Sequence, residues 1–205
     1  MSNHLNPFQD PNFEVLSPIN HNDLGGQWSE VTKTSGFRIF HSIYYCIILS
    51  SSIGIIFLYI SSNESLLTSL LNTFIGFSLV ILILPIHEVI HYISFTAFGA
   101  KTVRIKMYLR QGLVLTIADK FFAERKQMIW ISIVPFVVLS IGCILLLPFL
   151  SNNYLIIALS ILLFHTSISY NDIRMADFFL KKGKDIYLYS DLSKNTTYFF
   201  KRTFS

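Results

Sequence analysis

The chain has 205 residues, of which 52% are hydrophobic, 15% aromatic and only 14% charged. Soluble domains carry about 25% charged residues, so the composition disfavours a water-soluble globule, and its hydrophobicity disfavours intrinsic disorder. The net charge of +4 does not indicate a nucleic-acid partner, because the basic residues form no basic face and instead follow a membrane topology.

The first 36 residues are polar, without an apolar period, and predict a flexible cytoplasmic N-terminal arm. Four apolar stretches follow, and a helix needs about 20 such residues to cross a bilayer. They predict transmembrane helices at about residues 39–60, 66–98, 127–150 and 154–172. The last stretch is slightly short unless it continues past Asn171.

The basic residues are distributed unequally between the segments that flank these stretches. Two precede the first stretch, seven lie between the second and third, seven follow the fourth, and the two remaining loops have none. By the positive-inside rule, this distribution predicts a multi-pass protein of the cell membrane with both termini in the cytoplasm. Residues 181–205 would then form a basic cytoplasmic tail that contacts anionic lipid.

Residues 101–119 follow a different pattern. Apolar and polar side chains alternate from Val103 to Arg110, with the period of two that is typical of a half-buried strand. Gln111-Gly112 can form a turn, and residues 113–118 can return as a second strand. The predicted fold class is therefore an all-α membrane protein, with four transmembrane helices in a domain of residues 37–180 and a short cytoplasmic β-hairpin between helices 2 and 3.

The second apolar stretch contains the string His87-Glu88-Val89-Ile90-His91, an HExxH motif. Residues four apart project from the same side of a helix, so both imidazoles can bind one zinc ion per chain. Glu88 is then placed to act as the catalytic general base. Ionisable residues within a membrane helix are costly and usually mark a functional site. Alternatively, the two histidines are polar anchors at the membrane boundary and Glu88 faces solvent.

Topology indicates the third metal ligand. The second and fourth stretches cross the membrane in the same direction, so Asp172, at the end of the fourth, lies at a depth similar to that of the motif. We expect Asp172 to be the ligand; the alternative is a helix-end carboxylate paired with Arg174. Asp177 is the reserve ligand, since it lies five residues further along.

Two more polar residues are secondary candidates. His165 lies two helical turns before Asp172 and is a deeper ligand, a transition-state donor or an interhelical hydrogen-bonding group. Asn171 is a donor to the scissile carbonyl, a group that orients a ligand, or a helix cap. Pro85 and Pro135 lie inside apolar stretches, where each can kink a helix and free a carbonyl group.

These motifs together resemble a known family. Leu84-Pro85 before the HExxH string, Phe98-Gly99 after it, the basic strand-like segment, Pro135 and the final Asn171-Asp172 are similar to the zincin peptidase family of bacterial multi-pass membrane proteins, formerly a domain of unknown function. The resemblance covers about residues 75–182. A more distant similarity is to site-2 proteases, which carry HExxH on one membrane helix and a ligand Asp on another. In that group Gly follows the Asp, whereas Ile173 follows Asp172 here.

The predicted function is a zinc-dependent, membrane-embedded endopeptidase that cleaves membrane or membrane-adjacent peptide segments near the cytoplasmic face. The expected partners are a membrane protein or peptide substrate and the lipid bilayer. The resemblance to site-2 proteases implies that residues 101–119 hold an extended substrate by strand addition. The alternative is a non-enzymatic membrane protein, such as an immunity, scaffold or transport component, with a structural or vestigial metal site.

Overall fold

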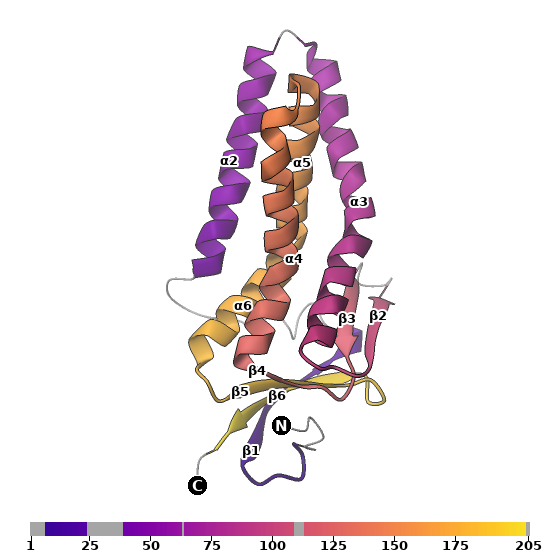
Figure 1. Cartoon of the computed structure of the whole chain (residues 1–205), viewed down its shortest axis with the longest axis vertical. Helices are drawn as coiled ribbons and strands as arrows, with labels where there is room; N and C mark the ends of the chain where they lie inside the picture. Colours follow the sequence, from indigo (N-terminus) through magenta and orange to yellow (C-terminus); the bar gives the residue numbers. More distant parts are fainter. Residues whose placement is uncertain (1–6, 24–38, 63, 109–112, 204–205) are drawn as a thin grey trace.

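The computed structural model describes residues 7–23, 39–62, 64–108 and 113–203. Long helices pack side by side, and a small β-sheet lies across one end of this helix bundle (Figure 1). The predicted Gln111-Gly112 turn and most of the second half of the predicted N-terminal arm lie outside the described residues.

Three helical segments are long and apolar enough to cross a membrane: α2 (Ile39–Ser61), α3 (Leu66–Ala97), and α4 (Arg125–Leu146) together with its 3-10 extension η3 (Leu147–Phe149). The predicted fourth transmembrane helix is wrong as a single element. It is broken into α5 (Asn152–Ile168) and α6 (Tyr170–Lys182), which are bent by 51° relative to each other.

The break between α5 and α6 occurs at Ser169. Its backbone N–H and its hydroxyl both donate to the carbonyl oxygen of His165, the hydroxyl at 2.9 Å. A serine that bonds back to the preceding turn in this way often bends a helix. The hydropathy pattern did not reveal the break, because α5 is apolar up to Ile168 and the chain stays helical beyond it.

The predicted all-α class is also wrong, because the structure contains a four-stranded antiparallel sheet with the order β1-β6-β5-β4. Its strands are β1 (Phe13–Asn20), β4 (Phe122–Glu124), β5 (Ile186–Asp191) and β6 (Thr196–Arg202). Strand β1 lies within the predicted flexible arm, and β5 and β6 lie within the predicted tail. β1 is stabilised by pairing with β6, about 180 residues away, so no local period reveals it. The aromatic runs in β5 and β6 were the available signal.

The hairpin expected over residues 101–119 is present. Strands β2 (Val103–Tyr108) and β3 (Leu113–Ala118) pair antiparallel, from Val103 opposite Ala118 to Tyr108 opposite Leu113. The chain then connects to the larger sheet through a bridge between Asp119 and Ser190 on β5. The hairpin therefore lies between α3 and the sheet.

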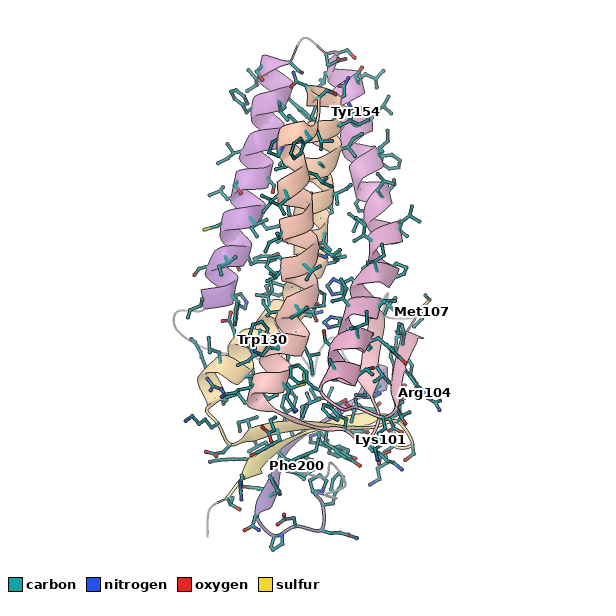
Figure 2. All side chains as sticks on the ribbon, viewed as in Figure 1. Lys101, Arg104, Met107, Trp130, Tyr154 and Phe200 are labelled. Atoms are coloured by element: carbon teal, nitrogen blue, oxygen red, sulfur yellow. The ribbon has the colours of Figure 1, made fainter. Side chains whose placement is uncertain are left out.

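The main hydrophobic core lies where the helices meet the sheet. It includes Phe95 of α3, Ile131 of α4, Phe178 and Phe179 of α6, and Phe199 of β6. Further from the sheet, α2 and α3 expose large apolar side chains, as helices in contact with lipid do. Tyr154 lies at the end of the bundle remote from the sheet, whereas Lys101 and Arg104 lie at the sheet end (Figure 2).

Candidate metal centre

The HExxH residues lie in the sheet-proximal half of α3, and all three are buried. The side chains of His87, Glu88 and His91 are 4%, 7% and 7% exposed. Their candidate ligand atoms lie within 4.8 Å of one another. The Nε2 atoms of His87 and His91, one helical turn apart, are separated by 3.1 Å. The α-helical spacing thus directs both imidazoles to one point, as the sequence predicts.

The carboxylate of Asp172 lies against both imidazoles. Its Oδ2 is 3.1 Å from Nε2 of His87, and its Oδ1 is 3.5 Å from Nε2 of His91. Asp172 lies in the first turn of α6, directly after the bend that ends α5. The guanidinium of Arg174, the alternative partner of this carboxylate, lies instead over the ring of Tyr170.

The second ring nitrogen of each histidine also has a partner. Nδ1 of His91 donates to the carbonyl oxygen of Ile131 on α4 at 2.9 Å, so that Nε2 keeps its lone pair. Nδ1 of His87 lies 3.2 Å from Nε2 of His165, which is 2% exposed. Metal-binding histidines commonly have such a partner, which orients the ring and fixes the tautomer.

The carbonyl of Ile131 is available because of a residue four positions later. In a regular helix this oxygen would accept from the N–H of residue 135, but Pro135 has no N–H. Pro135 was expected from the sequence to free a carbonyl group. No sequence pattern indicated that His91 uses this carbonyl, because the contact joins two different helices.

The Glu88 carboxylate is held by the hairpin. The hydroxyl of Thr116 on β3 lies 2.7 Å from Oε2 of Glu88 and 3.0 Å from its backbone oxygen. Thr116 was not among the site residues expected from the sequence. It is the one hydroxyl-bearing residue of the otherwise apolar strand LVLTIA, and this was the only signal that could have identified it.

The donor set fits a zinc ion. Two imidazole nitrogens and a carboxylate oxygen converge, and each imidazole is fixed from behind by a hydrogen-bond partner. Catalytic zinc sites in proteins use three such ligands and leave a further position for water or substrate. His87, His91 and Asp172 can therefore hold zinc, with Glu88 next to them.

Asp177 does not face this centre. Its buried carboxylate accepts the N–H groups of Phe40 and His41, in the first turn of α2, at 3.3 and 3.0 Å, and also contacts Nδ1 of His41. Arg125 holds the other end of α6 by donating to the carbonyls of Phe179 and Leu180. These contacts anchor α6. Asp177, the reserve ligand, therefore holds α6 to α2 and does not contribute to the candidate metal centre.

A cavity of about 810 Å³ extends from the centre to the sheet. Its lining includes the HExxH residues and Asp172, the secondary candidate Asn171, residues Val114–Ala118 of β3, and residues of the four-stranded sheet. His21, Ser190 and Thr197, which the sequence analysis did not assign to any site, are among them. A cavity of this size next to the candidate general base can accommodate part of a peptide substrate.

Comparison with known proteins gives one positive result. Neither the curated proteins nor the solved structures contain a significant match to the chain. A family model described as "Putative zincin peptidase" matches residues 80–187. These residues include the HExxH motif, Asp172, Pro85 and Pro135. Because that match covers more than half of the chain, the protein belongs to this zincin peptidase family.

Proposed function

We propose that the protein is a zinc-dependent endopeptidase embedded in the membrane, with His87, His91 and Asp172 as the zinc ligands and Glu88 as the general base. One observation carries the proposal. The carboxylate of Asp172, from a distant helix, lies 3.1 and 3.5 Å from the two HExxH imidazoles, next to a buried glutamate. Membership of the zincin peptidase family supports the same chemistry.

Each residue has a defined task. A bound zinc ion would polarise the scissile carbonyl and acidify water. Glu88, aligned by the Thr116 hydroxyl, accepts a proton from the attacking water and later passes it to the leaving amine. His165 and the Ile131 carbonyl keep the two imidazole rings in the tautomer and orientation that ligation needs.

The position of the cavity favours a substrate segment at the membrane surface. The cavity lies where apolar helices meet the sheet, and residues Val114–Ala118 of β3 line it. Strand β3 pairs with β2 on one side, so an extended peptide can add to its other edge. A helical substrate must unwind first, because its own hydrogen bonds hide the backbone.

The charge distribution favours a cytoplasmic location for the sheet end. Lys101 and Arg104 lie there, whereas the loops at the far end of the bundle carry no Lys or Arg (Figure 2). Trp130, exposed on α4 near the sheet, is suited to the membrane–water interface. We therefore place the centre near the cytoplasmic face of the bilayer.

The test uses the detergent-purified full chain. Glu88→Gln should keep about one zinc ion per chain and lose cleavage by about 10²- to 10⁴-fold, because it removes only the base. His91→Ala should lose the zinc as well, as measured by elemental analysis. Substrates are sought by comparing membrane-fraction proteomes from cells with wild-type and Glu88→Gln chains. Glu64→Gln, at an exposed position near the start of α3, is the matched control.

The outcomes are distinct. Wild-type proteolysis by a purified Glu88→Gln chain would rule out the proposed mechanism. A wild-type chain that binds no zinc would instead favour a non-enzymatic membrane protein. Activity is measured separately from zinc content, because a zinc-binding protein can be inactive.

A further inference from the structure

At the sheet end of the cavity, hydrogen bonds connect polar side chains from three distant parts of the chain. His21 follows β1, and its Nε2 lies 2.8 Å from the hydroxyl of Thr197 on β6. Nδ1 of His21 lies 3.2 Å from the hydroxyl of Tyr108 on β2. The Thr197 hydroxyl is in turn 2.8 Å from that of Ser190 on β5. These contacts form a connected polar cluster, which we define as His21, Tyr108, Ser190 and Thr197.

Three members of the polar cluster line the same cavity as the candidate metal centre. His21, Ser190 and Thr197 are only 1%, 4% and 4% exposed, yet they border the cavity. Between them and the metal centre the lining is mainly apolar and includes Phe95, one helical turn beyond His91, and Phe121. Ligand pockets commonly combine apolar walls with a few polar groups that fix the ligand's orientation.

The cluster has unused hydrogen-bonding capacity. A hydroxyl group offers one donor and two acceptor lone pairs, so Ser190 and Thr197 can each bond a further group. Burial, together with the charge of Lys106, lowers the pKa of His21 and outweighs its hydrogen bond to Asn195. His21 is therefore neutral at pH 7. The cluster suits an uncharged polar group better than an ion.

The cluster residues that line the cavity lie outside the part of the chain that carries the proposed chemistry. His21, Ser190 and Thr197 fall before or after residues 80–187, whereas the HExxH motif and Asp172 fall within them. The candidate metal centre thus comes from the region that matches the family, and the cavity-lining members of the polar cluster come from segments before and after it.

We propose that His21, Ser190 and Thr197 form a specificity subsite that binds an uncharged polar side chain of the substrate, such as Ser, Thr, Asn or Gln, at a fixed distance from the scissile bond. This inference rests on the proposed peptidase function. The apolar lining between the subsite and the metal centre accommodates apolar substrate residues in between. Substrates that lack the polar residue leave the remaining hydrogen-bonding capacity of the two buried hydroxyls unused and bind less well.

The experiment measures cleavage preference with a synthetic peptide library. In the library each position is Ala, Leu, Ser, Asn, Asp or Lys in turn, and the enzyme is the zinc-loaded full chain in liposomes. The wild-type chain should prefer Ser or Asn at one position. Thr197→Val, which replaces a hydroxyl with a methyl group of similar size, should reduce that preference by about 3- to 10-fold, the equivalent of one hydrogen bond.

Two further variants complete the design. Thr196→Val is the matched control, because Thr196 neighbours Thr197 on β6 and its hydroxyl donates to Lys194. It should keep the wild-type preference. Ser190→Ala should weaken the preference as Thr197→Val does, and it provides a second measurement if one variant folds poorly. Zinc content and thermal stability are measured for each variant.

The results separate this inference from the proposed function. Cleavage by the wild-type chain without a polar preference would overturn the subsite and leave the peptidase intact, as would an unchanged preference in both Thr197→Val and Ser190→Ala. A wild-type chain that binds zinc but cleaves no library peptide and no membrane protein would overturn both.

Discussion

The main-chain oxygen of Ile131 lies 2.9 Å from Nδ1 of His91 and accepts its proton. This contact links α4 to the HExxH motif on α3. It depends on Pro135, which cannot donate a hydrogen bond to Ile131 within α4. Proline usually weakens a helix. Here Pro135 leaves the Ile131 carbonyl free to accept from His91, and this hydrogen bond orients a candidate metal ligand.

Pro135→Ala should therefore weaken zinc binding. The alanine N–H can bond the Ile131 carbonyl and compete with His91, and the loss of such a partner typically lowers metal affinity by about 10- to 100-fold. Competition with a chelator measures the zinc dissociation constant. Pro148→Ala, in η3 at the far end of α4, is the control and should bind zinc as the wild type does. Equal zinc affinities in all three chains would contradict this role.

Thr116→Val should slow catalysis without loss of zinc. The substitution removes the hydrogen bond to the Glu88 carboxylate, and a bond to a charged group contributes about 1.5–3 kcal/mol. The cleavage rate should fall by about 10- to 100-fold, measured as kcat on a peptide found by proteomics. Thr96→Val, on the exposed face of α3, should leave the rate unchanged. A loss of zinc from Thr116→Val would show that the threonine acts on the metal ligands instead.

Gly76→Ala should destabilise the helix bundle. A Cβ atom at Gly76 would lie 2.6 Å from both the carbonyl oxygen of Ile157 and Cβ of Ser160 on α5. Such overpacking costs about 1–3 kcal/mol. Thermal unfolding in detergent should show a lower midpoint for Gly76→Ala. Gly142→Ala is the matched control, because its Cβ would have no neighbour within 4 Å, and an equal shift in both variants would argue against close packing of α3 on α5.

The stability of the sheet should fall at acid pH because of His21. Its pKa is lowered in the folded protein by burial and by Lys106, so the unfolded chain binds a proton first as the pH falls below about 6.5. Stability is then lost below that pH, by at most about 1.4 kcal/mol per pH unit for one proton. Thermal midpoints measured between pH 7.5 and 5 should decline less steeply for His21→Gln than for the wild type. The two chains differ only at this residue, so parallel curves would show that His21 does not contribute.

Much of the candidate centre could be predicted from the sequence, because it depends on local spacing. Two histidines four residues apart share a helix face in any helix, and the expected order of the apolar stretches indicated Asp172 as the carboxylate at a similar depth. The hairpin could be predicted because apolar and polar residues alternate along its first strand and because its two strands are neighbours in the chain. Hydrophobic length indicated α2, α3 and α4.

The remaining features depend on contacts between residues far apart in the sequence. Strand β1 is stabilised by β6 near the other end of the chain, and the polar arm around it shows no period of its own. The α5–α6 bend arises from a hydroxyl that bonds its own backbone, which hydropathy does not detect. The partners of Glu88, His87 and His91 lie on β3, α5 and α4. The sequence by itself determined which side chains are candidates for the metal centre, because that depends on residue type and local spacing. Only the tertiary structure decided how they are held and what encloses them, because packing and hydrogen bonding join segments that no local pattern connects.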